Sequence, residues 1–433
     1  MTQISDPFTL PGGAVVPNRL VKAAMTEQIA GPDGAANARH ERLYRRWAEG
    51  GIGLQITGNM MVDRRHREHP ANIMLDPIPT GEAFEGLQRL AQAAKSRGAL
   101  ALVQLSHSGR QTPKIVNAHP EAPSPVTLGL PGSQFGEPKA MTEDDITRTA
   151  SQFVAAAEVI AKAGFDGVQV HGAHGYLLSS FLNPRANQRE DGYGGSLENR
   201  ARLLLEVVER IRERLPASFV LSVKLNSSDF QKGGLSTEDS LQVADWLAAR
   251  GVDLLEVSGG NYEQPAMMDI AGMERRHEER KAESTKTREA YFLVFAEAIR
   301  QRNAMPLMVT GGFRSLSGMN DALSSGATDL IGLARPLCVE PDLPKDFLTG
   351  RKEIVPSYEK FLRIGPGWLG PHSPIKLVKA LNGFSAMSFF YDNIARMADG
   401  REPTPKGHIL KTFIAQQKAA KDLASQLPNP SAG

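Results

Sequence analysis

Cysteine is almost missing from this sequence of 433 residues, which contains Cys338 alone. One cysteine cannot form an intramolecular disulfide, and it cannot ligate an iron–sulfur cluster or a cysteine-rich zinc site. An excess of charge of one sign is missing too, because 50 Lys and Arg balance 48 Asp and Glu. We therefore expect no nucleic-acid partner and no attraction to an anionic membrane surface.

Long apolar runs are also missing. The sequence has no stretch of 18 consecutive apolar residues, so we expect no membrane-spanning helix. The first residues, MTQISDPFTLPGG, lack the charged region and apolar core of a signal peptide. These absences, with an ordinary apolar content of 41%, predict a cytoplasmic globular protein.

The sequence does contain eight short apolar runs, each bounded by turn residues. Amphipathic stretches separate these runs, most clearly at 143–163, 196–215 and 237–250. Alternating strands and helices predict an α/β fold with a parallel sheet, and eight units can close it into a (β/α)8 TIM barrel. An open doubly wound sheet is the alternative, but no GxGxxG follows the first strand. The expected strands are Arg19–Met25, Ile52–Gly58, Leu100–Leu105, Asp166–His171, Phe219–Asn226, Asp253–Gly259, Pro306–Gly312 and Asp329–Arg335.

Two segments exceed a minimal barrel, which we expect to occupy residues 1–350. The connection after the third strand, Ser106–Met141, is long and rich in Pro and Gly, and we interpret it as a lid over the barrel mouth. Residues 351–433 are expected to form a C-terminal helical extension with an amphipathic run at His408–Leu427 and a frayed end. Such helices could form or block a contact between copies of the chain, so the sequence leaves a homo-oligomer open.

Two expected strands alternate apolar and polar residues. The fourth has Val168 and Val170 alternating with Gln169 and His171, and the fifth alternates similarly around Lys224. Successive side chains of a strand point to opposite faces, so we expect the apolar set to contact the helices and the polar set to face the barrel interior.

The second strand is interpreted in the same way, with Leu54 and Ile56 toward the helices and Gln55 and Thr57 inward. Polar side chains that face inward near C-terminal strand ends are costly unless they meet a ligand or each other. Active sites of this fold lie at that C-terminal mouth. The side chains expected to converge there are Gln104, His171 and Lys224.

The loops after the last two strands carry phosphate-binding chemistry. These loops read VTGGFRS and GLARPL, and phosphates often bind at this position of a TIM barrel. Gly311 and Gly312 would let the backbone approach an anion closely, and Arg335 could add a charged fork. The glycines alone could simply turn the chain, but the two loops together favour a phosphate site.

Several motifs together resemble the Old Yellow Enzyme family of FMN-dependent NAD(P)H oxidoreductases. They are NRLVKAAM, LVQLSHSGRQ, HGAHGYLLSSFLNP followed by NQREDGYGGSLENR, SVKLNSSD, VTGGF and GLARPL, in the family's order between about residues 7 and 343. The resemblance implies a barrel that holds FMN, receives electrons from NADPH or NADH, and reduces activated C=C bonds of α,β-unsaturated carbonyl or nitro compounds. The partner would therefore be a small electrophilic alkene or a related acceptor.

The resemblance also implies the residues that bind the cofactor. Gln104 would hydrogen-bond the flavin pyrimidine, Lys224 would lie near N1 and O2, and the Thr26 hydroxyl would lie near O4. Ala24 and Met25 would line the ring, Asn59 would contribute through its backbone, and Gly311, Gly312, Ala334 and Arg335 would hold the phosphate.

By the same resemblance, His171 and His174 would bind the substrate oxygen, and Tyr176 would protonate the α-carbon. Hydride transfer to the β-carbon pushes charge onto that oxygen, so hydrogen-bond donors aimed at it stabilise the transition state. The two histidines could instead ligate zinc, but no third ligand and no HExxH motif accompany them, so we predict no metal. His107 is interpreted as an anchor for its loop.

The match departs from the family pattern in three places. Lys224 stands where arginine is usual, Thr26 stands where one branch has cysteine, and a His/His pair replaces His/Asn. A Schiff-base lyase that uses Lys224 is one alternative function, and a non-catalytic flavin-binding barrel is another. The sequence does not identify the physiological acceptor or the preferred nicotinamide cofactor.

Overall fold

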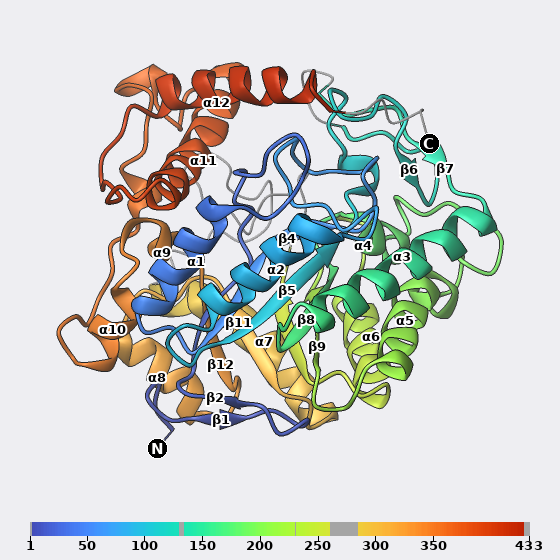
Figure 1. Cartoon of the computed structure of the whole chain (residues 1–433), viewed down its shortest axis with the longest axis horizontal. Helices are drawn as coiled ribbons and strands as arrows, with labels where there is room; N and C mark the ends of the chain where they lie inside the picture. Colours follow the sequence, from blue (N-terminus) through green and yellow to red (C-terminus); the bar gives the residue numbers. More distant parts are fainter. Residues whose placement is uncertain (1, 130–133, 230, 260–284, 428–433) are drawn as a thin grey trace.

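Eight parallel strands form a closed barrel at the centre of the molecule (Figure 1). The structure is a computed structural model, and it describes residues 2–129, 134–229, 231–259 and 285–427. The strands follow one another around the barrel in chain order, and the last pairs with the first, which confirms the predicted TIM barrel. Their bounds are β3 Leu20–Lys22, β4 Leu54–Met61, β5 Leu100–Ser106, β8 Gly167–Gly172, β9 Val220–Asn226, β10 Leu254–Ser258, β11 Leu307–Thr310 and β12 Leu330–Leu333.

Helices surround the barrel, and local sequence signals set where several of them begin. Thr142 Oγ1 accepts a hydrogen bond from Asp145 N at 3.2 Å, and Asp145 Oδ2 accepts one from Thr142 N at 3.0 Å, which forms a capping box. The bounds are α1 Ala38–Glu49, α2 Gly81–Ala94, α3 Glu143–Lys162, α4 Leu177–Leu182, α5 Leu197–Arg214, α6 Thr237–Ala249, α7 Thr285–Arg302, α8 Leu316–Ser324, α9 Arg335–Val339 and α10 Leu343–Leu348.

An N-terminal hairpin closes one end of the barrel. Its strands, β1 Phe8–Thr9 and β2 Val15–Val16, pair antiparallel below the barrel in Figure 1. Leu10 and Val16 are fully buried against residues near the start of the barrel strands, including Leu54 and Leu254. This apolar plug leaves the opposite end, where the strands finish, to hold polar groups.

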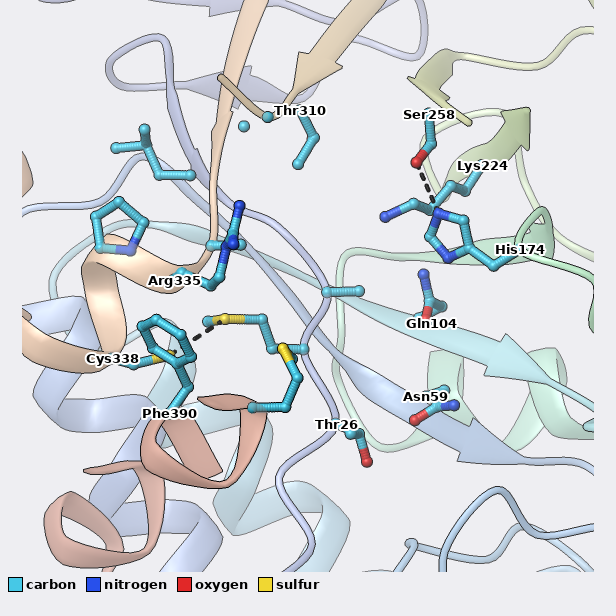
Figure 2. A pocket seen from close by; sticks show the side chains of 18 of the residues that line it. Thr26, Asn59, Gln104, His174, Lys224, Ser258, Thr310, Arg335, Cys338 and Phe390 are labelled. Carbon is cyan, nitrogen blue, oxygen red and sulfur yellow. Dashed lines mark hydrogen bonds between the residues drawn. The ribbon is translucent and has the colours of Figure 1, made fainter. Parts of the chain in front are cut away.

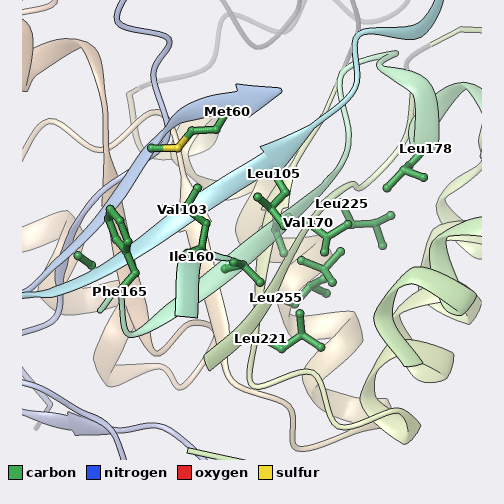
Figure 3. Packing of buried hydrophobic residues seen from close by; sticks show 14 of the residues in the cluster. Met60, Val103, Leu105, Ile160, Phe165, Val170, Leu178, Leu221, Leu225 and Leu255 are labelled. Carbon is green, nitrogen blue, oxygen red and sulfur yellow. The ribbon is translucent and has the colours of Figure 1, made fainter. Parts of the chain in front are cut away.

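The alternation of side chains is as predicted for β8 and β9, but the prediction for the second strand is wrong. Val170 and Leu225 join the large apolar cluster between strands and helices, part of which is drawn in Figure 3. In β4, by contrast, Leu54 and Ile56 fill the barrel interior. Gln55 points outward, and its Nε2 donates to the Ala94 carbonyl at 2.9 Å. The reversal has a physical reason, because that carbonyl at the end of α2 needs a donor.

Two further helices follow the barrel, as the sequence predicted. They are α11 Lys376–Ala398 and α12 Ile409–Ala424, and α11 packs against α1, α9 and α12 (Figure 1). The predicted frayed end, residues 428–433, lies outside the described residues. None of the helices described is long and apolar enough to cross a membrane.

The long connection after β5 contains little regular structure in its described part. It has a short helix η1 Gly109–Gln111 and two parallel two-residue strands, β6 Glu121–Ala122 and β7 Lys139–Ala140. Short 3-10 helices also occur at η3 Tyr358–Lys360 and η4 Gly367–Leu369.

Candidate active site

One cavity opens at the C-terminal end of the barrel, and every site residue predicted from the sequence lines it. It encloses about 1310 Å³, part of which is open solvent at the mouth. Each barrel strand, or the chain directly after it, contributes at least one lining residue. The predicted residues found there are Ala24, Met25, Thr26, Asn59, Gln104, His171, His174, Tyr176, Lys224, Gly311, Gly312, Ala334 and Arg335.

The lining is chemically divided. Figure 2 shows Gln104, His174 and Lys224 grouped on one side of the cavity, and Arg335 with Phe390 on the other. The polar group comes from β5, from β9 and from the turn after β8. His171 and Lys224 are partners across the β8–β9 ladder, which places their side chains next to each other.

A chain of buried polar contacts runs beneath the polar side of the cavity. Gln104 Nε2 donates to Gln169 Oε1 at 2.8 Å, and Gln169 Nε2 donates to Glu256 Oε2 at 2.9 Å. The other carboxylate oxygen, Glu256 Oε1, lies 2.8 Å from Lys224 Nζ. Glu256 was not predicted from the sequence, although a single acid in the apolar run LLEVS indicates a buried carboxylate that needs a partner.

His171 and His174 lie close together as neutral imidazoles. Their ring centroids are 5.1 Å apart and the rings are nearly perpendicular. Burial lowers the pKa of both rings well below the usual range, and the nearby Lys224 ammonium lowers it further. His171 Nδ1 accepts from Ala173 N at 3.2 Å, so its N–H is at Nε2. The neutral ring can therefore donate one hydrogen bond.

Neighbouring residues hold His174 in an unusual backbone conformation. Its φ of 63° is in the left-handed region, and its N–H donates to Asn226 Oδ1 at 3.2 Å. Its carbonyl accepts from Gln111 Nε2 at 3.0 Å, and its Nε2 lies 2.7 Å from Ser258 Oγ. Ser258 also lines the cavity, but it belongs to none of the motifs found in the sequence and was not predicted.

Tyr176 completes this group. It is 6% exposed, and its ring centroid lies 4.8 Å from that of His171 with the ring planes nearly perpendicular. Tyr176 stands directly before α4, where its carbonyl accepts from Ser180 N at 2.7 Å. The strand-to-helix turn after β8 therefore brings His171, His174 and Tyr176 to one place.

Thr26 and Asn59 belong to a small polar cluster beside the cavity. Asn72 Nδ2 donates to Thr26 Oγ1 at 3.3 Å and lies 3.5 Å from Asn59 Oδ1. Glu68 joins them: burial raises the pKa of its carboxyl, and hydrogen bonds with Thr26, Asn72 and Asn59 oppose that shift. Glu68 and Asn72 were not predicted from the sequence, because they lie in an irregular segment after β4.

The opposite side of the cavity combines glycines with two arginines. Gly311 and Gly312 have φ of 112° and 83°, a region that side chains rarely adopt. Arg314 Nη2 donates to Glu359 Oε1 at 2.8 Å, and Arg335 Nη1 lies 3.8 Å from the same oxygen. Both arginines line the cavity, and Glu359 comes from the segment that precedes α11.

Helix α11 supplies an apolar part of the wall that the sequence analysis did not predict. Phe390 is 2% exposed and stacks edge-on against Phe389 at 5.3 Å between centroids. Cys338 Sγ lies 3.5 Å from Met25 Sδ on the same side, and burial raises the pKa of its thiol to about 12. The lining residues from α11 are Met387, Phe390, Tyr391 and Ile394.

In its described part, the predicted lid supports the active-site turn and does not line the cavity. His107 Nδ1 accepts from Gly109 N at 3.1 Å, and the His107 carbonyl accepts from Leu177 N at 2.9 Å. His107 also belongs to a buried group with the spacing of metal ligands. The two carboxylates of that group already form ion pairs, Asp63 with Arg65 at 2.6 Å and Glu121 with Arg148 at 2.6 Å.

Known proteins of one family resemble this chain over most of its length. The model of the NADH:flavin oxidoreductase / NADH oxidase family matches residues 4–353. The NADH-dependent flavin oxidoreductase iliE of Neonectria sp. (strain DH2) is 39% identical over 355 residues, which cover 78% of this chain and only 46% of that protein. An NADPH dehydrogenase of Geobacillus sp. (strain WCH70) is 31% identical over 85% of this chain and 99% of its own. The structure of the old yellow enzyme homologue from Zymomonas mobilis is similar with a TM-score of 0.68 at 26% identity, over 81% of this chain and 94% of that chain.

Proposed function

Because the chain belongs to the NADH:flavin oxidoreductase / NADH oxidase family, and is thus an FMN-dependent oxidoreductase that uses NADH or NADPH, we propose that it reduces activated C=C bonds. The substrates would be α,β-unsaturated carbonyl or nitro compounds. The observation that carries the proposal is the group formed by His171, His174 and Tyr176 on the wall of the cavity that also holds Lys224 and Gln104.

The residues of the cavity fit FMN. Lys224 and Gln104 present a cation and an amide on one side, as a flavin pyrimidine requires. Gly311, Gly312 and Arg335 offer close backbone approach and a guanidinium fork for a phosphate on the other side. Between these ends the wall includes apolar side chains that suit a planar ring system: Ala24, Met25, Phe390 and Ile394.

The two histidines would bind the oxygen of the substrate. When bound, FMN supplies the hydride that reaches the β-carbon of the alkene. Negative charge then develops on the carbonyl or nitro oxygen, and neutral His171 and His174 can each donate a hydrogen bond to it. By analogy with oxyanion holes, one such donor is worth about 3 kcal/mol of transition-state stabilisation.

Tyr176 would donate the proton to the α-carbon. A phenol with an ordinary pKa of about 10 is a weak acid in water. It becomes effective when it is held within reach of a carbon that gains negative charge. The position of Tyr176 beside His171 supports this role, because a substrate whose oxygen meets the imidazole would place its alkene nearby.

The alternatives are less well supported. A Schiff-base lyase needs a Lys224 amine that is free to attack a carbonyl, but Lys224 Nζ lies 2.8 Å from Glu256 Oε1 in a buried ion pair. A non-catalytic flavin-binding barrel would have no need of His171, His174 and Tyr176 in one cavity.

Product analysis tests the proposal. The protein should be incubated with 2-cyclohexenone and NADH or NADPH under anaerobic conditions, and the organic products identified by gas chromatography. We expect cyclohexanone in an amount equal to the nicotinamide consumed. A protein that contains FMN and is reduced by NAD(P)H, yet forms no saturated product from enones or nitroalkenes, would contradict the proposed substrate class.

A further inference from the structure

Two buried residues that do not line the cavity hold two residues that do. Gln169 and Glu256 are both 0% exposed, and they contact Gln104 and Lys224, the expected partners of the flavin pyrimidine. We propose that Glu256 is a positioning residue for the cofactor: it offsets the charge of Lys224 and, through Gln169, sets the direction in which Gln104 offers its hydrogen bonds. This inference rests on the proposed placement of Gln104 and Lys224 at the flavin.

The direction of the amides follows from the chemistry of a carboxylate. Glu256 beside a lysine ammonium is an acceptor only, so Gln169 must turn its amino group toward Glu256, at 2.9 Å. Gln169 Oε1 is then the atom that faces Gln104, and it accepts from Gln104 Nε2 at 2.8 Å. The remaining N–H and the carbonyl oxygen of Gln104 are left to offer a donor and an acceptor. A flavin pyrimidine edge presents both kinds of partner.

The charge argument concerns Lys224. Its side chain is 5% exposed and its Nζ lies 2.8 Å from Glu256 Oε1, so the ammonium and the carboxylate form a nearly neutral pair. Reduction of a bound flavin adds negative charge beside that pair. Lys224 favours the added negative charge and Glu256 opposes it. Both groups are buried, so solvent screens their interaction with the flavin only weakly. Glu256 should therefore keep the flavin harder to reduce than Lys224 alone would.

The two-electron midpoint potential of the bound flavin tests this role. In the FMN-loaded Glu256→Gln variant we expect the reduction equilibrium to shift at least about tenfold toward reduced flavin, which corresponds to about 30 mV more positive. Glu256→Asp keeps the charge and should stay within about threefold of the wild-type equilibrium constant. Asp253→Asn is the matched control, because it breaks another ion pair, with Arg212 at 2.6 Å, directly before the start of β10. It should leave the potential unchanged.

The hydrogen-bond relay has a separate test. Gln169→Met removes the link to Gln104 but leaves Glu256 beside Lys224, so it should weaken FMN binding by about tenfold with little change in potential. A flavin-loaded Glu256→Gln protein with the wild-type potential would overturn the charge role, and wild-type FMN affinity in Gln169→Met would overturn the relay. If the wild-type protein itself bound no FMN, the proposed function would fail instead.

Discussion

The imidazoles of His171 and His174 are neutral, and one ring nitrogen of each already contacts the protein. The other nitrogen of each ring is left to meet a ligand. The Ala173 N–H occupies His171 Nδ1, and Ser258 holds His174 Nε2. A buried imidazolium beside the Lys224 ammonium would be costly, which is why the pKa of each ring falls well below its usual range. At the residue scale, the two neutral rings therefore suit the proposed role of donating hydrogen bonds to a substrate oxygen, and they are poorly suited to contact with a cation.

This arrangement predicts the effect of removing either ring. His171→Ala or His174→Ala should weaken binding of a phenolic ligand about tenfold, because one hydrogen bond to a charged oxygen is lost, while the FMN content stays intact. Ligand titration monitored by the flavin spectrum measures this effect. His119→Ala, at an exposed position outside the cavity, is the control. Loss of the flavin in either variant would show that the histidine serves the cofactor.

The role proposed for Tyr176 can be separated by kinetics from the role proposed for the two histidines. Tyr176→Phe keeps the ring that packs against His171 and removes only the hydroxyl. Reoxidation of the reduced enzyme by an enone should slow at least about a hundredfold, in line with the contribution of a general acid, and reduction by NAD(P)H should be unaffected. Stopped-flow measurement of the two half-reactions checks this. Equal slowing of both would remove Tyr176 from the role of proton donor.

At the scale of elements, strand alternation predicted part of the site and assigned the two faces of one strand the wrong way round. The pattern of β8 and β9 placed His171 and Lys224 in the interior, where the structure has them. The same pattern in β4 failed for Gln55, because alternation separates two faces without saying which is inside. The side on which Gln55 lies is decided by its hydrogen bond to the Ala94 carbonyl at the end of α2, which is a different element.

Helix α11 shows the limit of reading elements from their own sequence. The sequence predicted a helical extension after residue 350 but singled out no helix at 376–398, and the cavity residues that α11 supplies depend on how it packs against α1 and α9. Residues 376–398 also lie beyond the family match, which ends at residue 353. The part of the wall that α11 supplies therefore lies outside the matched motifs, which is why they could not predict it.

A substitution within α11 tests its part in retaining the cofactor. Phe390→Ala removes a buried ring from the cavity wall. We expect the Kd for FMN to rise at least about tenfold and the free energy of unfolding to fall by about 3 kcal/mol. Phe384→Ala on the same helix is the control, since that ring is 44% exposed and outside the cavity. Fluorescence titration with FMN compares them, and equal Kd values for the two variants would contradict the role of α11.

At the scale of the whole molecule, polarity is graded along the barrel axis. The hairpin end is filled by apolar residues such as Leu10 and Val16, the middle by the paired Gln169 and Glu256, and the mouth by groups that can meet a ligand. Eight recurring strands and a long set of motifs made this architecture predictable. The ion pair at its centre was not, because it joins residues that are 32 positions apart in sequence and adjacent only across the β9–β10 ladder.

The most direct test of the account is the visible absorption of the purified protein through one anaerobic cycle. The flavin band should bleach on addition of NADH or NADPH and return on addition of 2-cyclohexenone, with one enone consumed per flavin reoxidised. A flavin that bleaches but is not reoxidised by any enone or nitroalkene would contradict alkene reduction, and a colourless protein that does not take up FMN would contradict the cofactor site itself.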